Sequence, residues 1–438
     1  MKKWEKAALI TVLTGTLCMM LIFAGWKWYD ANVDRSGWTK QDEACYYKDF
    51  HGRYVTGWQE IGGETYHFSS DGVMNTGWLE QENGRCYLAE DGSLCTGWLE
   101  IEGTRYYFSA DGVMCTGWLE WEGRRCFFDD AGRLVTGWLD DGENRYYMDA
   151  SGSAVTGWNS IAGQKYYFRA DGSMMTGWAE LEDGKHYFDD NGVMAVGWTD
   201  IGAQRYYFQS DGTMMTGWLR EGERSYYLKD DGVMAIGQTQ IDGQTCYFSP
   251  GGVYVLLVNP WNPLPEGYEV ELTDLGNGYQ VASLCYDSLR QMLEDCTAAG
   301  GSPKICSAYR TQGEQEYLFY RLYWKFRELG YGEESAYDNA ATQVAKPGTS
   351  EHQLGLAVDI ISSENGNLDH SQIWTFTQQW LMEHSWEYGF ILRYPEEKTD
   401  ITGIIFEPWH YRYVGTDIAR ELRELGICLE EYLGAENA

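Results

Sequence analysis

Four side chains near the C-terminus have the types and the spacing for metal-assisted hydrolysis. His352 and Asp359 lie seven residues apart in Ser-Glu-His-Gln-Leu-Gly-Leu-Ala-Val-Asp, and Glu407 and His410 follow in Glu-Pro-Trp-His. Two imidazoles and one carboxylate form a three-ligand zinc set, which leaves the fourth coordination position for water. The remaining glutamate, three residues from a ligand, can accept the proton of that water. The pattern predicts a zinc metallopeptidase site made of His352, Asp359, His410 and Glu407.

The chain around these residues predicts how they are positioned. An odd separation would place the first pair on opposite faces of a straight strand, so Gly355 is expected to mark a bend. Pro408 would break a helix, so the second pair is expected in a loop that leads into residues 411–414. Convergence of the four side chains therefore depends on tertiary structure.

The region from 254 to 438 is expected to fold as one α+β domain. Its composition differs from that of the preceding chain, and its patterns predict both helices and extended segments. Helices and short strands that do not alternate regularly favour an α+β fold. The expected helices cover 283–299, 312–330 and 333–345, and the expected extended segments cover 304–309, 355–361 and 410–414.

The region from 29 to 253 is repetitive. A tryptophan preceded by glycine recurs every twenty residues from Trp38 to Trp218, until Gln238 breaks the series. Short aromatic runs separated by glycine-containing turns predict one β-hairpin per repeat, and hairpins of this size must stack to bury their faces. The expected fold is therefore a β-hairpin solenoid. Its aromatic side chains either mainly pack the column or form a ligand site at most repeat junctions.

The N-terminal segment 1–28 is expected to be a signal anchor or a signal peptide. Three lysines precede an uncharged run from Ala7 to Gly25, which is nearly long enough to span a membrane. Both interpretations place the rest of the chain outside the membrane. The formal net charge of −33 at pH 7 argues against binding to nucleic acid.

The chain contains 11 cysteines and no Cys-x-x-Cys zinc pair. Cys95 and Cys115 occupy the same position in neighbouring repeats, so a disulfide between them is the one pairing that the sequence suggests.

The array resembles the cell-wall-binding repeats of Gram-positive surface proteins, which include choline-binding and glucan-binding modules. The choline cage of such repeats usually has a tryptophan immediately before a tyrosine pair. Here a basic residue occupies that position, as in Arg105, Arg145, Lys165 and Arg205. A positive side chain in the cage wall would repel choline. The expected ligand is therefore a wall polysaccharide or an anionic wall polymer such as teichoic acid.

The C-terminal domain resembles the zinc D-alanyl-D-alanine carboxypeptidases of the VanY type. Four motifs carry the resemblance in order, at residues 307–311, 347–359, 388–395 and 407–415. The resemblance implies that His352, Asp359 and His410 bind zinc, that Glu407 is the catalytic base, and that Arg310 stabilises the substrate carbonyl. Ala308 and Thr311 stand where the family usually has glycine and serine, outside the metal set.

Ser350 and Gln315 are secondary candidates for hydrogen bonds to the substrate. A turn cap and a helix-surface amide are the alternative roles for these two side chains. A serine mechanism is disfavoured because the chain has no Ser-x-x-Lys motif.

Together these patterns predict a zinc carboxypeptidase on the outer face of a Gram-positive cell, membrane-anchored or wall-associated. Its expected substrate is the peptidoglycan stem peptide, from which it would remove the C-terminal D-alanine. One alternative is L,D-carboxypeptidase activity on tetrapeptide stems. Another is an adhesin that binds wall or host glycans and carries an inert peptidase-like domain.

Overall fold

The computed structural model describes residues 37–49 and 52–435. The expected anchor or signal segment at 1–28 lies outside these residues. Among the helices that are described, none combines the length and the apolar character needed to cross a membrane. The chain divides into two compact units, one with residues up to 181 and 186–195, the other with residues 182–185 and 196–438.

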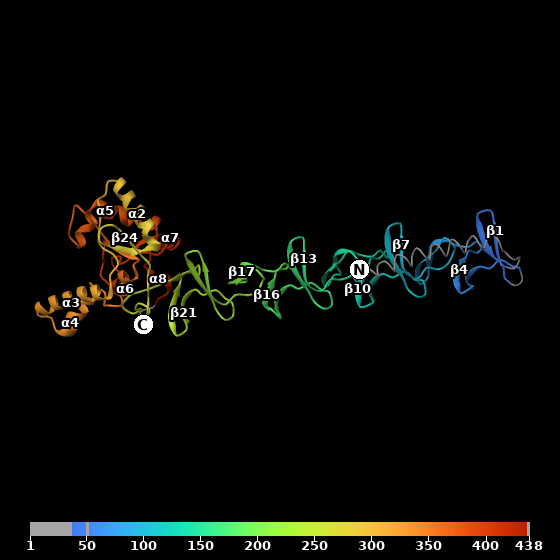
Figure 1. Ribbon diagram of the computed structural model, residues 1–438, viewed down its shortest axis with the longest axis horizontal. Helices are drawn as coiled ribbons and strands as arrows, with labels where there is room; N and C mark the ends of the chain where they lie inside the picture. Colours follow the sequence, from blue (N-terminus) through green and yellow to red (C-terminus); the bar gives the residue numbers. More distant parts are fainter. Residues whose placement is uncertain (1–36, 50–51, 436–438) are drawn as a thin grey trace, which may run out of the picture. The chain divides into compact units, whose positions relative to one another are not determined.

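The repeats fold as two-stranded antiparallel hairpins, as the sequence predicts (Figure 1). They pair β1 (Trp38–Gln41) with β2 (Ala44–Tyr47), β3 (Gly57–Ile61) with β4 (Glu64–Phe68), β5 (Gly77–Gln81) with β6 (Gly84–Leu88), β7 (Gly97–Ile101) with β8 (Thr104–Phe108), β9 (Gly117–Trp121) with β10 (Arg124–Phe128), β11 (Gly137–Asp140) with β12 (Arg145–Met148), β13 (Gly157–Ile161) with β14 (Gln164–Phe168), β15 (Gly177–Leu181) with β16 (Gly184–Phe188), β17 (Gly197–Ile201) with β18 (Gln204–Phe208), β19 (Gly217–Glu221) with β20 (Arg224–Leu228), and β21 (Gly237–Ile241) with β22 (Gln244–Phe248).

Neighbouring hairpins pack through buried side chains and through tryptophan rings, as β5 to β8 show. In the hairpin of β7 and β8, Phe108 lies opposite Gly97 and is fully buried. Trp78 of the preceding hairpin packs edge-on against Tyr106, with ring centroids 5.0 Å apart. The tight Asp-Gly turns require glycine, because a Cβ at Gly92 would lie 2.3 Å from the sulfur of Met74. These contacts give the repeat aromatics a packing role.

The suggested disulfide between Cys95 and Cys115 is not formed. Both residues are free thiols, as are all the cysteines that the structure describes. Partial burial raises the pKa of the Cys95 thiol to about 11, which disfavours the thiolate needed for oxidation.

The C-terminal domain is built on a four-stranded antiparallel sheet with the order β26-β27-β29-β28. The strands of this sheet are β26 (Pro303–Ser307), β27 (Ala357–Ser362), β28 (Phe390–Leu392) and β29 (His410–Tyr413). A separate two-stranded sheet pairs β24 (Leu272–Asp274) with β25 (Gln280–Ala282). The helices of the domain are α2 (Ser283–Ala298), α3 (Gln312–Glu328), α4 (Glu333–Ala341), α5 (Phe376–His384), α6 (Thr399–Thr402), α7 (Thr416–Leu425) and α8 (Leu429–Leu433). Three short 3-10 segments are η1 (Glu351–Leu354), η2 (His370–Trp374) and η3 (Ser385–Tyr388).

The three helices and three extended segments expected in this domain are all present. The third helix, α4, ends at Ala341 and falls short of the expected 345. The carbonyl of Thr342 accepts a hydrogen bond from the Ile405 amide at 3.0 Å. The carbonyl that directly follows α4 is therefore bonded to a distant segment and not to the next turn of a helix.

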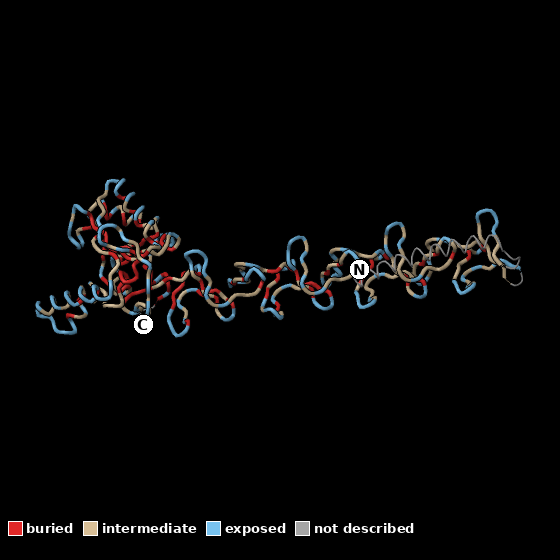
Figure 2. Tube along the Cα trace, viewed as in Figure 1, coloured by how far each residue is buried: buried red, intermediate tan, exposed pale blue. Residues whose placement is uncertain are grey.

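The hydrophobic core of the domain lies between the sheet and helices α2 and α5, where the buried tube segments in Figure 2 gather. A second cluster joins Tyr247 of β22 to Leu257, Ile391 and Ile418. Strand β23 (Tyr254–Val255) also pairs with β22, so the last hairpin gains a third strand just after the expected boundary at 253. The last repeat and the C-terminal domain therefore share apolar packing.

Candidate metal and catalytic site

The three expected zinc ligands converge. One ligand atom from each of His352, Asp359 and His410 lies within 4.8 Å of the others, and all three side chains are buried. Asp359 on β27 is the register partner of His410 on β29, so the sheet itself brings these two together. His352 reaches them from η1, which is followed by Gly355 with a φ of 74°. The expected bend at Gly355 is thus present.

Hydrogen bonds orient both imidazoles. Nδ1 of His352 donates to the Ala308 carbonyl at 2.7 Å, which leaves Nε2 as the free ring nitrogen. That Nε2 lies 3.3 Å from Oδ2 of Asp359, and Nδ1 of His410 lies 3.1 Å from Oδ1 of the same carboxylate. Two imidazole nitrogens and a carboxylate oxygen fit zinc, which with three protein ligands keeps a position for water. The residues present therefore fit this metal.

Glu407 lies beside this set. Its Oε2 is 3.7 Å from Nδ1 of His410, and its backbone carbonyl accepts a hydrogen bond from the His410 amide. Glu407 and His410 thus lie in a turn through Pro408 and not in a helix, as the sequence predicts. Burial, with a contribution from the nearby charge of Asp359, raises the pKa of Glu407 to about 8. A carboxyl group with a pKa near neutrality is suited to exchange protons with a reacting water.

Burial and neighbouring charges shift the pKa values of the two histidines in opposite directions. Burial, together with Arg310, lowers the pKa of His352 to about 4, so its imidazole is neutral at pH 7. Burial also opposes charge on His410, but Asp359 and Glu351 outweigh it and raise the pKa to about 9. The pKa of Asp359 is well below its usual range because His352 and His410 outweigh the cost of its burial.

Arg310 and Gln315 form a connected pair at the site. The Arg310 guanidinium donates to Oδ2 of Asp359 at 3.0 Å, to the Ser307 hydroxyl at 2.9 Å and to the Gln315 side-chain oxygen at 3.2 Å. Gln315 is fully buried, and its amide nitrogen donates to the Ala345 carbonyl at 2.7 Å. Both polar groups of Gln315 thus bond within the protein, and the alternative of a helix-surface amide is wrong.

Ser350 lies at the other expected substrate position. It is buried, and it precedes η1 without making a side-chain cap hydrogen bond. It lines the same cavity as His352 and Glu407. The alternative role as a turn cap is therefore not realised.

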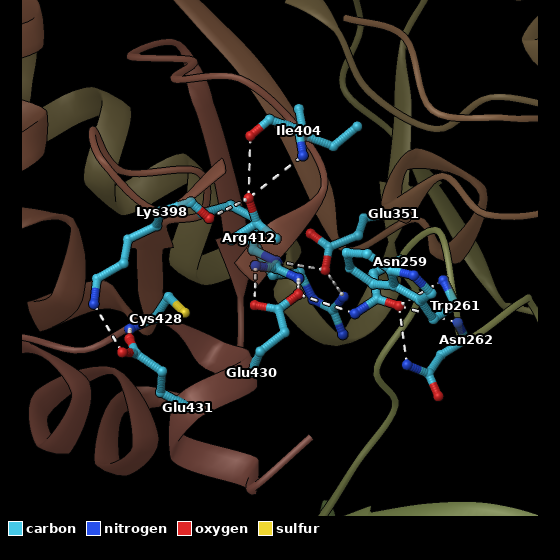
Figure 3. A network of polar contacts seen from close by, with 12 residues as sticks. Asn259, Trp261, Asn262, Glu351, Lys398, Ile404, Arg412, Cys428, Glu430 and Glu431 are labelled. Atoms are coloured by element: carbon cyan, nitrogen blue, oxygen red, sulfur yellow. Dashed lines mark hydrogen bonds and ion pairs between the residues drawn. The ribbon is translucent and has the colours of Figure 1, made fainter. Parts of the chain in front are cut away.

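A buried ionic network behind the metal set was missed by the sequence reasoning (Figure 3). Glu351 forms ion pairs with Arg393 at 2.8 Å and Arg412 at 2.9 Å, and Arg393 also forms a two-pronged pair with Glu430. These side chains are almost completely buried. Three of the four motifs named above contain Glu351, Arg393 and Arg412, so the motifs could have singled out these residues. Which of them pair with one another depends on the fold.

The site opens into a cavity of about 1050 Å³. The cavity is lined by residues of α3 and by the catalytic cluster of His352, Asp359, Glu407 and His410. A cavity of this size is at the upper end of the range for small-molecule sites.

Comparison with known protein families agrees with this geometry. Residues 279–416 match the family model VanY, D-alanyl-D-alanine carboxypeptidase. Residues 55–94, 155–196 and 195–238 match a choline-binding repeat, and residues 96–114 and 136–154 match a cell wall binding repeat.

Curated relatives match the C-terminal region. A D-alanyl-D-alanine carboxypeptidase of Enterococcus faecalis is 43% identical over 182 residues, which are 42% of this chain and 66% of that protein. The bifunctional D-Ala-D-Ala dipeptidase and carboxypeptidase VanXYC of Enterococcus gallinarum is 40% identical over 138 residues, 30% of this chain and 65% of that protein. The chain thus spans slightly less than two thirds of the length of these relatives.

Solved structures resemble each part. A Zn(II) complex of a variant of the D,D-pentapeptidase VanY, from a VanB-type resistance cassette, is 42% identical over 40% of this chain and 97% of its own, with a TM-score of 0.38. CbpJ of Streptococcus pneumoniae is 29% identical over 53% of this chain and 97% of its own, with a TM-score of 0.43. From its family matches, the chain carries a C-terminal domain of the VanY family of D-alanyl-D-alanine carboxypeptidases, preceded by choline-binding-type cell-wall repeats.

Proposed function

We propose that the protein is a zinc-dependent carboxypeptidase that removes the C-terminal D-alanine from peptidoglycan stem peptides. The observation that carries the proposal is the convergence of His352, Asp359 and His410, with Glu407 beside them, at a cavity. His352, Asp359 and His410 would hold the metal, because one ligand atom of each lies within 4.8 Å of the others.

In this mechanism zinc supplies a Lewis acid, which activates water and polarises a carbonyl group. Glu407 would accept the proton of the attacking water on its carboxylate and later transfer it to the departing amine. Arg310, fixed by Ser307 and Gln315, would donate to the carbonyl oxygen as negative charge develops there. Ser350 would contribute a further hydrogen bond to the peptide from the cavity wall.

Cleavage one residue earlier, by an L,D-carboxypeptidase, uses the same set of catalytic groups and is the second candidate. The resemblance to the D-alanyl-D-alanine carboxypeptidase family favours the first. Mass analysis of pentapeptide and tetrapeptide stems after incubation separates the two activities. Loss of one residue from the pentapeptide alone supports the D,D assignment, and loss from the tetrapeptide alone contradicts it.

We propose that the array retains the enzyme in the cell wall by binding a wall polysaccharide. Guanidinium groups already occupy tryptophan faces within it: Arg85 lies 4.3 Å from the Trp78 ring and Arg125 lies 4.2 Å from the Trp118 ring. An internal cation on these faces competes with choline. The strongly acidic chain also repels teichoic acid, which makes an uncharged polysaccharide the better candidate.

Retention of the full protein on purified peptidoglycan, with and without attached teichoic acid, tests the role of the array. Equal retention on both supports the polysaccharide. A loss of retention after the teichoic acid is removed would identify that polymer as the ligand. In this proposal the N-terminal segment 1–28 delivers the enzyme to the outer face of the membrane, as an anchor or as a cleaved signal.

A further inference from the structure

Helix α3 exposes an aromatic face beside the catalytic cluster. Tyr317, Tyr320 and Trp324 are 66%, 47% and 59% exposed, and they recur at intervals of three and four residues. Side chains with this spacing lie on one side of a helix. Figure 2 shows the outer part of the α3 and α4 pair as largely exposed chain.

Packing within α3 accounts for only part of these aromatic side chains. The Tyr320 ring lies 5.3 Å from Phe319 and the Trp324 ring lies 4.9 Å from Tyr323, yet Tyr320 and Trp324 remain 47% and 59% exposed. The opposite side of α3 holds Phe319, which is fully buried and contacts Tyr337 of α4 with ring centroids 5.0 Å apart. Tyr323 also faces Tyr337, at 6.4 Å. The contact between α3 and α4 is therefore made without the exposed face, which leaves that face available to a ligand.

The exposed face belongs to the same cavity as the catalytic residues. Tyr317, Tyr320 and Trp324 line the cavity of about 1050 Å³ that His410 and Glu407 also line. Two terminal alanine residues would fill only a small part of this volume. The remaining space extends along α3, where a longer substrate would lie.

The charges on this face favour a polar, uncharged group. Arg321 and Lys325 line the cavity together with Glu316 and Glu328, so bases and acids balance. Attraction to an anionic membrane surface would require an excess of bases. Aromatic rings combined with polar groups of both signs suit a sugar, whose apolar ring face packs on an aromatic plane while its hydroxyl groups bond at the edge.

We propose that Tyr317, Tyr320 and Trp324 form a binding site for the sugar to which the stem peptide is attached. This site would hold the glycan end of the substrate while the D-alanine end reaches the metal set. The inference rests on the proposed function and deepens it, because it makes glycan-linked stems the preferred substrates over free peptides.

A double substitution tests the site. Tyr320→Ala with Trp324→Ala is compared with the wild type on two substrates, a disaccharide pentapeptide and an acetylated tripeptide that ends in D-Ala-D-Ala. We expect kcat/KM to fall about tenfold on the disaccharide pentapeptide, mainly through KM, as loss of two aromatic contacts implies. On the tripeptide it should stay within about twofold of the wild type. Trp374→Ala, which removes a 78% exposed tryptophan outside the cavity, is the matched control.

Equal rates for variant and wild type on the disaccharide pentapeptide would overturn the inference, and so would an equal loss on both substrates. Loss of binding to anionic lipid vesicles or of self-association, with unchanged rates on both substrates, would overturn it in favour of another occupant. If the wild type cleaved neither substrate, the proposed function itself would fail, which is a result distinct from these.

Discussion

Nε2 of His410 lies 3.6 Å from Oε2 of Glu351, while Nδ1 of the same ring lies 3.1 Å from Oδ1 of Asp359. The imidazole is therefore held between two carboxylates. Neither Nε2 of His410 nor Oε2 of Glu351 has a hydrogen-bond partner elsewhere in the described chain. A proton on Nε2 would be stabilised by Glu351, which leaves Nδ1 free to bind zinc.

Glu351→Gln should weaken zinc binding about 10- to 100-fold, since loss of a carboxylate behind a metal-binding histidine has effects of this size. Zinc affinity is measured by competition with a chromogenic chelator. Glu430→Gln is the matched control, because Glu430 pairs with the same Arg393 but does not face His410. Both variants should lose stability, and an equal loss of zinc affinity in both would contradict the orienting role of Glu351.

The network also predicts acid sensitivity of the fold. Burial opposes charge on Glu351, but Arg393 and Arg412 lower its pKa below its usual value of 4.5. A carboxyl group with a lowered folded pKa contributes stability above its unfolded pKa, and this contribution is lost as pH falls. The melting temperature of the wild type should therefore decrease below about pH 4.5 more steeply than that of Glu351→Gln. Parallel curves for the two proteins would remove Glu351 from this effect.

Zinc binding to the metal-free protein should release protons at neutral pH. His410, with a pKa of about 9, carries a proton at pH 7 that must leave before Nδ1 can bind the metal, whereas His352, with a pKa of about 4, is already neutral. We expect release of about one to two protons at pH 7, and fewer above pH 9. Calorimetry in buffers with different ionisation enthalpies measures this number. Zinc binding with no proton release at pH 7 would contradict the assignment of His410.

Glu407→Ala should strongly slow hydrolysis while sparing zinc and wall binding. A general base typically contributes 10²- to 10⁴-fold, so kcat on stem peptides should fall by about that factor. Retention on peptidoglycan should be unchanged, which also separates the enzyme from an adhesin with an inert domain. Hydrolysis that persists at the wild-type rate would remove Glu407 from the mechanism.

Arg310→Met should lower kcat about 100-fold, as loss of one donor to a developing oxyanion usually does. Arg310 also pairs with Asp359, so zinc content must be measured beside the rate. A variant that keeps its zinc but loses kcat supports the role of Arg310 at the substrate. Full zinc loading with an unchanged kcat would assign Arg310 to the support of Asp359 alone.

The sequence predicted what depends on local pattern. A twenty-residue period with turn glycines predicted the hairpins, and the mixture of helical and extended segments predicted the α+β domain. The types and spacing of four residues, together with the four motifs, predicted the metal set. Gly355 was recognised as a bend because a straight strand could not bring His352 and Asp359 to one side. Hydrophobic periodicity likewise located α2 and α3.

Relationships between distant segments could not be read from the sequence. Arg393, which follows β28, meets Glu430 of α8 only in the folded chain. Nothing in the type of either residue indicates that it has a buried partner. A surface amide stayed open as an alternative role for Gln315, because the burial of this side chain depends on how α3 meets the loop at Ala345. The short helices η1 and α6 have too few residues for a periodic signal.

The central claim is zinc-dependent removal of a terminal D-alanine, and a stem-peptide digest tests it most directly. The full protein is incubated with pentapeptide stems in the presence and absence of a chelator and of a β-lactam, and the products are weighed by mass spectrometry. We expect loss of one alanine residue, abolished by the chelator, restored by zinc and insensitive to the β-lactam. Activity that resists the chelator and is blocked by the β-lactam would contradict the account.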